Sequence, residues 1–343
     1  MKLALDATYS VGRDLSGVGV YSREILTGLA RAHPEARFLA CFRPHRFWRG
    51  LLVPLPANCR RRLLHETWTT RRADLFHGLN QRLPALRCRR SVATFHDLFV
   101  LTGEYSTPEF RERFARQARD AAARADLIIA VSDFTASQVE QLLGVERSRL
   151  RVVHHGVRCL PPSGAPRGRI LLHVGAIQQR KNVARLVEAF ERLPAGWRLV
   201  LAGSAGYGAE KILARIEASP RRADIDVLGY VSSQQLAGLY QRAAILAFPS
   251  LDEGFGMPVL EAMANGVPVL TSNRSALPEV AGDAALLVDP EDGESIADGL
   301  CRLAGDEELR QELREKGYRR ASQFTWETAV VKTWQVYREL LDR

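Results

Sequence analysis

The chain has 343 residues, 46% hydrophobic content, 25% charged residues and a formal net charge of +9. A chain of this length can bury a large core, and it most simply forms two domains. No run approaches the roughly 18 apolar residues of a membrane span, and Asp6 interrupts the apolar start of a signal peptide, so membrane-spanning and secreted proteins are disfavoured. We therefore expect a cytoplasmic protein. Five cysteines lie scattered without a Cys-x-x-Cys pair, so neither a disulfide framework nor a zinc site is predicted.

The positive charge belongs to the first half of the chain. Residues 1–160 contain 26 Lys and Arg against 15 Asp and Glu, whereas residues 161–343 contain 22 against 24. The aromatic residues are not interleaved with the arginines as a nucleic-acid stacking platform would require, so no nucleic acid is expected. An anionic membrane surface or a phosphate-bearing substrate fits better, since each basic residue near an anionic leaflet contributes about 1 kcal/mol. An arginine-rich solvated surface is the alternative.

The first predicted elements are a strand over residues 2–7 and a helix from about Val20 to Ala30. The loop between them ends in Ser16-Gly17-Val18-Gly19. A glycine loop between a strand and a helix lets backbone amides approach a phosphate, although the same pattern also makes a tight turn.

Four further strands are predicted in the first half, at residues 37–42, 74–77, 91–95 and 127–131, with a last one at 150–154, while residues 44–62 show no clear periodicity. His77, Asn80 and His96 follow two of these strands, where functional side chains collect. A lone histidine more often makes a local hydrogen bond than serves as a catalytic residue.

A basic amphipathic helix is predicted over residues 108–125, with Thr107 as its cap. Phe110, Phe114 and three alanines form its apolar face, and arginines occupy much of the remainder. Such a helix can lie on a membrane, but packing of the apolar face on the domain core is the favoured interpretation.

Residues 160–168 contain five prolines or glycines and form the best linker in the chain. A second series of strands and helices follows, with strands at residues 170–174, 198–202, 225–228, 244–248 and 267–271. Arg180 and Lys181 lie at a predicted helix start, where cations and amide donors can together neutralise a diphosphate.

The most informative stretch is Glu253-Gly254-Phe255-Gly256-Met257-Pro258-Val259-Leu260-Glu261. It follows a buried strand, and Pro258 suits the first turn of a short helix that Gly266 would end. Ligands of α/β units bind beyond the carboxyl ends of the strands, where this loop would lie. Carboxylates accept paired hydrogen bonds from vicinal hydroxyls, so Glu253 and Glu261 indicate a sugar or ribose, with a solvated loop acid and a helix-start acid as the alternative.

Two glutamates separated by seven residues, with Gly-Phe-Gly-Met-Pro between them, resemble the signature of the family 4 retaining glycosyltransferases of GT-B fold. The resemblance covers nearly the whole chain and is more specific in the second half. It implies an α/β protein of two Rossmann-like domains that face a deep cleft. Residues 1–160 would form an acceptor-binding domain and residues 167–323 a nucleotide-sugar-binding domain, with residues 324–343 crossing back onto the first.

The resemblance also implies roles for individual residues. Glu261 would hold the ribose, Glu253 and the backbone of residues 255–257 the sugar, and His96 would lie near the transferred sugar, so that His96 and Glu253 are the expected catalytic residues. The expected donor-binding residues are Gly17, Gly19, Gly175, Arg180, Lys181, Ser204, Tyr230, Val231, Gly254, Phe255, Gly256, Met257, Pro258, Val259 and Glu261. Because the two cations can stabilise a leaving diphosphate, we expect neither a metal nor a cofactor.

The expected reaction transfers a hexose from a nucleotide sugar with retention of configuration. The stretches at residues 76–80 and 94–97 look most like bacterial mannosyl- or rhamnosyltransferases of surface-polysaccharide assembly, which use GDP-sugars and a saccharide acceptor on a polyprenyl diphosphate at the inner face of the cell membrane. His155-Gly156-Val157-Arg158 departs from the more usual Asn-Gly-Val-Asp, so no role is assigned to it. A UDP-sugar donor, a sugar-nucleotide epimerase and a basic membrane- or nucleic-acid-binding module are the alternatives.

Overall fold

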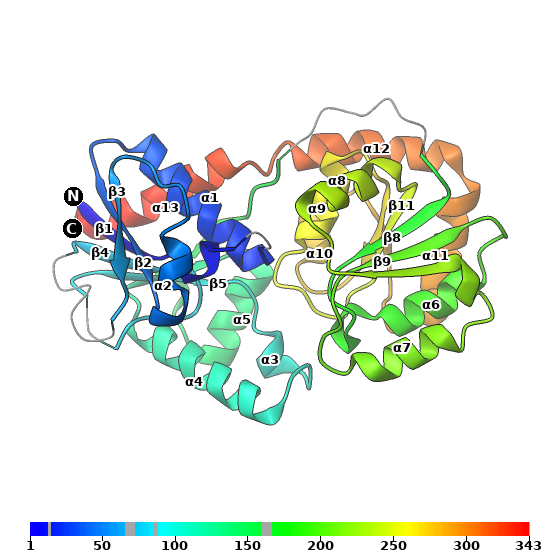
Figure 1. Ribbon diagram of the computed structural model, residues 1–343, viewed down its shortest axis with the longest axis horizontal. Coiled ribbons are helices and arrows are strands. Elements are labelled where there is room, and N and C mark those ends of the chain that lie inside the picture. Colours follow the sequence, from blue (N-terminus) through cyan, green and yellow to red (C-terminus); the bar gives the residue numbers. More distant parts are fainter. Residues whose placement is uncertain (13–14, 66–72, 86–87, 159–166, 343) are drawn as a thin grey trace. The chain divides into compact units, whose positions relative to one another are not determined.

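The computed structural model describes residues 1–12, 15–65, 73–85, 88–158 and 167–342. The chain forms two compact units (Figure 1). Unit 1 comprises Met1–Thr102, Pro108–Gly156 and Phe324–Arg343, and unit 2 comprises Gly103–Thr107 and Val157–Gln323. The division falls beside the predicted linker, most of which lies outside the described residues.

Unit 1 is built on a seven-stranded parallel sheet in the order β3-β2-β1-β4-β5-β6-β7. The order reverses direction between β1 and β4, which makes the carboxyl ends of these strands the natural place for a ligand. The strands are β1 (Lys2–Asp6), β2 (Arg37–Phe42), β3 (Cys59–Leu63), β4 (Leu75–Gly78), β5 (Ser91–Phe95), β6 (Leu127–Ala130) and β7 (Leu150–Val152). The helices are α1 (Gly17–Ala32), α2 (Pro44–Gly50), α3 (Phe99–Thr102), α4 (Pro108–Arg124), α5 (Asp133–Leu143) and α13 (Trp326–Leu341), with 3₁₀ turns η1 (Thr8–Ser10) and η2 (Arg147–Arg149).

Unit 2 is built on a six-stranded parallel sheet in the order β10-β9-β8-β11-β12-β13. Its strands are β8 (Ile170–Val174), β9 (Arg198–Ala202), β10 (Ile225–Gly229), β11 (Ile245–Phe248), β12 (Val269–Ser272) and β13 (Leu286–Val288). Its helices are α6 (Val183–Glu191), α7 (Ala209–Glu217), α8 (Ser233–Arg242), α9 (Met257–Ala264), α10 (Leu277–Ala281), α11 (Gly293–Gly305) and α12 (Glu307–Ala321), with 3₁₀ turns η3 (Gln179–Lys181) and η4 (Arg222–Asp224). Each unit therefore has the doubly wound architecture that the sequence predicts.

The C-terminal helix α13 closes the core of unit 1. It packs along α1, where Gly28 gives it room: a side-chain carbon at Gly28 would lie only 2.4 Å from Val330. Tyr337 is fully buried, and its hydroxyl lies 2.6 Å from Nδ1 of His77 on β4. The last helix thus belongs to the first unit, and its aromatic residues pack as predicted.

One local prediction was wrong. The helix α1 begins at Gly17, because the side chain of Ser16 caps it by accepting from the amide of Gly19, so Gly17 and Gly19 lie in a helical turn rather than in a loop. Residues 44–62, which had no assignment, contain α2 and the edge strand β3, whose alternate residues are exposed arginines. The helix expected from Asn182 is confirmed as α6, which follows the short turn η3.

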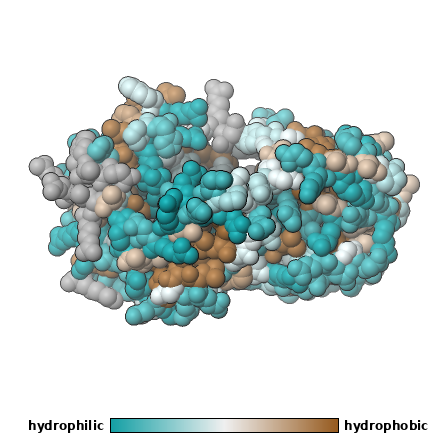
Figure 2. All heavy atoms as spheres, turned by 90° about the horizontal axis from the view of Figure 1, so that it is seen from below, coloured by the Kyte–Doolittle hydropathy of each residue, from teal (hydrophilic) through white to brown (hydrophobic). Residues whose placement is uncertain are grey.

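Surface character varies over the molecule. The face drawn in Figure 2 is largely hydrophilic, with hydrophobic areas between the polar side chains. Among the described residues, no helix has the length and apolar character needed to cross a bilayer.

Candidate functional site

The candidate site of unit 2 lies at the carboxyl edge of its sheet. The loops after β8 and β11 meet there, because the amide of Leu251 donates to the backbone oxygen of Arg180 at 2.8 Å. Asn182 strengthens the junction: its side-chain amide donates to the backbone oxygens of Pro249 and Pro290 at 3.1 and 2.7 Å. Asn182 adopts a left-handed conformation, with φ of 59°, which lets η3 end and α6 begin at the same residue.

Arg180, Lys181 and Glu253 form a buried ion cluster in these loops. Arg180 Nη1 lies 3.0 Å from one carboxylate oxygen of Glu253, and Lys181 Nζ donates to the other. Burial by itself would raise the pKa of Glu253, but the charges of Arg180 and Lys181 outweigh it and lower the pKa to about 2. The predicted diphosphate-binding cations and the predicted sugar-binding carboxylate therefore lie together and hold one another in place.

The loop after β11 leads directly into α9. Gly256 has a φ of 105°, and a side-chain carbon there would lie 2.7 Å from Leu277, so both conformation and space require glycine. Pro258 lies in the first turn of α9, whose amides point toward the loop. This start of a helix offers donors for anionic or oxygen-rich groups.

Glu261 has a different environment from Glu253. It lies half-buried on α9 and accepts a hydrogen bond from the hydroxyl of Tyr240 at 2.9 Å. Burial raises its pKa, and the hydrogen bond from Tyr240 offsets part of that effect. Glu253 is therefore a carboxylate whose charge is compensated by two cations, whereas Glu261 is a carboxylate that accepts a hydrogen bond from a neutral hydroxyl.

The remaining predicted donor residues border the same edge of the sheet. Gly175 lies beside Lys181, since a side-chain carbon on Gly175 would be 3.4 Å from Lys181 Cε. The backbone oxygen of Ser204 accepts from Ile177 at 2.9 Å, and Tyr230 follows β10 with its ring half exposed. Residues 254–256 and 259 are buried, whereas Val231, Met257 and Pro258 are partly exposed.

Unit 1 has its own cluster at the carboxyl ends of β4 and β5. His96 is buried, and its Nε2 lies 2.9 Å from the backbone oxygen of Leu79, so Nε2 carries the proton and donates. Tyr21 meets the His96 ring edge-on at 4.7 Å between centroids, and His155 stacks on it at 5.4 Å. Burial lowers the pKa of His96 to about 4, so the ring is neutral at pH 7.

His77 serves the fold. Its two ring nitrogens lie 2.6 and 2.8 Å from the hydroxyls of Tyr337 and Thr94, and burial lowers its pKa to about 3. Gly17 and Gly19 lie in the first turn of α1. A side-chain carbon on Gly19 would lie 2.7 Å from the backbone oxygen of Tyr9, so close packing explains the glycine there.

Sequence reasoning missed Tyr240 and His155. Nothing local in the sequence connects Tyr240 with Glu261, because the two residues come together only when α8 packs beside α9. His155 lies in the stretch whose departure from the family pattern was noted, and this departure was the available signal.

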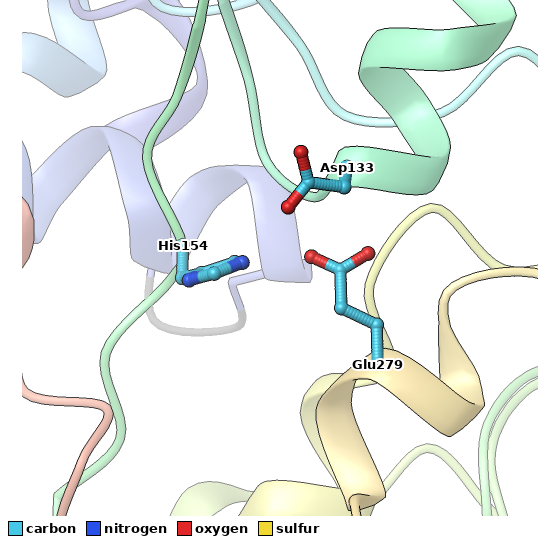
Figure 3. A group of neighbouring side chains, drawn as sticks. All are labelled: Asp133, His154 and Glu279. Atoms are coloured by element: carbon cyan, nitrogen blue, oxygen red, sulfur yellow. The ribbon is translucent and has the colours of Figure 1, made fainter.

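Acidic side chains outside the ion cluster are also candidates for metal ligands. The chain has one Asp-x-Asp, at Asp224 and Asp226, but these residues flank the amino end of β10 and pair with Arg221 and Arg198. Figure 3 labels Asp133 and His154, which belong to unit 1, and Glu279, which belongs to unit 2. Because these side chains belong to separate units, we assign no metal to them.

Two Rossmann-like units, one with buried cations and a helix start suited to a diphosphate, are the architecture expected of the GT-B class. Residues 163–320 match the family described as glycosyl transferases group 1, and residues 15–159 match glycosyltransferase family 4. The chain therefore belongs to the family 4 glycosyltransferases, and the predicted family and fold are confirmed.

Individual relatives agree with this assignment. The chain is 34% identical to an O-antigen chain mannosyltransferase B of Escherichia coli over 304 residues, which cover 81% of this chain and 79% of the relative. It is 31% identical over 250 residues to an MMP alpha-(1->4)-mannosyltransferase of Mycolicibacterium hassiacum, covering 70% of this chain and 58% of that protein. The structure of a sucrose-phosphate synthase from Thermosynechococcus elongatus matches with a TM-score of 0.81 and 21% identity, over 100% of this chain and 99% of that one.

Proposed function

We propose that this glycosyltransferase transfers a hexose from a nucleoside diphosphate sugar with retention of configuration and without a metal. The observation that carries the proposal is the ion cluster of Arg180, Lys181 and Glu253 beside the start of α9. Two fixed cations beside a helix start can stabilise the negative charge that develops on a leaving diphosphate. In other transferases a metal ion supplies this charge stabilisation.

Each carboxylate has a proposed partner in the donor. Glu261, held by Tyr240, would accept hydrogen bonds from the ribose hydroxyls, and Glu253 from the sugar hydroxyls. The resemblance implies attack on the same face that the diphosphate leaves, and this is the basis for proposing retention. His96, with its neutral ring, would serve as a hydrogen-bonding group near the reacting sugar.

The donor is proposed to be a GDP-sugar carrying mannose or rhamnose, and the acceptor a saccharide on a lipid diphosphate. Two relatives named as mannosyltransferases, one of them acting on an O-antigen chain, support the choice of mannose and of a polysaccharide acceptor. A UDP-sugar donor is the alternative to be tested beside it.

Peripheral association with an anionic membrane through unit 1 belongs to the same proposal. The predicted surface, α4, buries Phe114 and several alanines in the core, and its exposed residues include three arginines and three acidic residues, so it is a weaker candidate for contact with an anionic surface. The α2 region offers more: Trp48 and Leu52 are 77% and 85% exposed, and residues 37–65 hold seven arginines without an acidic residue. Exposed Trp and Leu beside arginines suit the interface of an anionic bilayer.

Titration with GDP, UDP, ADP and NAD, followed by thermal unfolding, tests the donor site. We expect selective stabilisation by one nucleoside diphosphate, lost in Glu261→Ala and Arg180→Ala and kept in Glu210→Ala, whose side chain is exposed on α7. Turnover of GDP-mannose and UDP-glucose, with and without acceptor, then separates a transferase from an epimerase. An absence of stabilisation by all four ligands would contradict the proposal.

A further inference from the structure

His173 is a fully buried histidine on β8, next to the ion cluster of unit 2. Its Nδ1 lies 3.0 Å from the backbone oxygen of Ala247 on the neighbouring strand β11. Because a carbonyl oxygen only accepts, Nδ1 carries the proton and Nε2 presents a lone pair. Among the residues that the structure describes, this Nε2 has no hydrogen-bond partner. A buried acceptor without a donor is unfavourable, so the question is which donor reaches it.

Three observations place Lys181 close to this lone pair. A side-chain carbon on Gly175 would lie 3.8 Å from His173 Nε2 and 3.4 Å from Lys181 Cε, so both groups border the same point. The His173 ring stacks on Phe248 with 5.8 Å between centroids, and Lys181 Nζ lies 4.7 Å from the centroid of that same ring. Burial, and to a smaller extent the charge of Lys181, lowers the pKa of His173 to about 4, so the ring is a neutral acceptor at pH 7.

We propose that His173 Nε2 accepts a hydrogen bond from the Lys181 ammonium when a nucleoside diphosphate occupies the site, which makes His173 a positioning residue for Lys181. The inference rests on the proposed function. The ammonium has three N–H donors, one of which goes to Glu253. His173 offers Lys181 a second anchor when the ammonium turns toward the diphosphate. Being neutral, this anchor leaves the full positive charge available to the diphosphate.

The test compares affinity for a diphosphate with affinity for the bare nucleoside. Calorimetric titrations with GDP, UDP, guanosine and uridine are made on the wild type and on His173→Phe, which keeps a ring against Phe248 but has no lone pair. We expect the Kd of the bound diphosphate to rise about five- to tenfold, as for loss of one hydrogen bond, with the nucleoside Kd unchanged within about twofold. His173→Gln, which again has a donor and an acceptor, should restore most of the affinity.

A double-mutant cycle with Lys181→Met separates positioning from packing. If His173 acts through Lys181, His173→Phe should change the diphosphate Kd less than about twofold in the Lys181→Met background. Three outcomes would overturn the inference alone. His173→Phe could raise the diphosphate Kd equally in both backgrounds, or raise the nucleoside Kd as much as the diphosphate Kd. It could also leave the diphosphate Kd unchanged although the wild type binds the diphosphate. A wild type that binds neither diphosphate would overturn the proposed function as well. Thermal unfolding verifies each fold, and His173→Leu replaces His173→Phe if the larger ring prevents folding.

Discussion

Unit 2 places an ion cluster in its candidate site, whereas the histidine cluster of unit 1 is neutral. Arg180, Lys181 and Glu253 are each more than nine-tenths buried, while residues 161–343 as a whole hold 22 basic and 24 acidic residues. In unit 1, His96 and His155 are both kept neutral by burial, and a separate buried ion pair of Arg43 with Asp6 lies at the ends of β1 and β2. The excess of 11 positive charges lies in residues 1–160. A buried ion cluster suits exchange with a charged diphosphate, and neutral rings suit hydroxyl groups.

The largest effect is expected at Lys181. Lys181→Met removes a cation that we propose stabilises the leaving diphosphate, and it removes one of the two ion pairs to Glu253. We expect kcat to fall by about 100-fold or more, the range seen when one preorganised stabilising donor is removed. Steady-state kinetics with the nucleotide sugar identified by titration would measure it.

Lys211→Met is the matched control, because Lys211 lies exposed on α7 of the same unit. It should retain wild-type kcat. A Lys181→Met enzyme with unchanged turnover would show that the buried charge of unit 2 serves stability rather than catalysis.

The second effect concerns stability against acid. Because the pKa of Glu253 is lowered from 4.5 to about 2, its ionisation stabilises the fold fully above about pH 5 and progressively less as the pH falls toward 2. The difference in unfolding free energy between wild type and Glu253→Gln should decrease by roughly 2 kcal/mol between pH 5 and pH 3. Denaturant titrations at several pH values measure this difference.

Glu261→Gln provides a control of opposite sign. Burial raises the pKa of Glu261, so its charged form destabilises the fold and protonation relieves this at low pH. The difference between wild type and Glu261→Gln should therefore increase as the pH falls. If the stability difference changed with pH in the same direction for both glutamates, the two carboxylates would not differ in environment as described, with Glu253 paired to cations and Glu261 bonded to a neutral hydroxyl.

The two units also differ in how much the sequence revealed. The site loops of unit 2 follow apolar strands and carry Gly, Pro and charged residues in fixed spacing, so local patterns predicted Arg180, Lys181 and the stretch from Glu253 to Glu261. The pairing of Glu253 with cations 72 residues earlier could not be predicted, because it depends on the parallel neighbours β8 and β11. The hydrogen bond from Tyr240 to Glu261 likewise depends on tertiary packing.

In unit 1 the patterns were weaker. The edge strand β3 reads Cys-Arg-Arg-Arg-Leu, which lacks the apolar alternation of a typical strand because its alternate side chains face solvent. Gly17 and Gly19 were assigned to a loop because glycine disfavours helices, yet the cap from Ser16 and the close approach to Tyr9 place them in α1.

A neutral role for His96 gives the third prediction. With its pKa lowered to about 4, His96 does not titrate between pH 6 and pH 8, so kcat/KM should show no step near pH 6.5 that depends on this residue. His96→Ala should lower kcat by roughly 10- to 100-fold while leaving the shape of the pH profile unchanged. His45→Ala, at an exposed position on α2, is the control.

Two outcomes would contradict this account of His96. Full turnover in His96→Ala would remove the residue from the reaction. A step near pH 6.5 in the wild type that disappears in His96→Ala would show a charged histidine and end the contrast between a charged site in unit 2 and a neutral one in unit 1.

The smallest effect on turnover is expected from the outer surface of unit 1. Replacing Trp48 and Leu52 together by serine removes the two most exposed large apolar side chains of the described residues without touching the buried clusters, so kcat with a water-soluble acceptor should not change. Binding to vesicles that contain phosphatidylglycerol should fall about tenfold in a sedimentation assay, since both the apolar anchors and their fixed place beside the arginines are lost.

Arg113→Ala with Arg116→Ala on α4 tests the competing surface, and these side chains can contribute only headgroup contacts, which 0.5 M salt should screen. A larger loss from the α4 pair than from the α2 pair would place the membrane contact on α4. Equal vesicle binding by all variants would leave the outer charge of unit 1 without a membrane role.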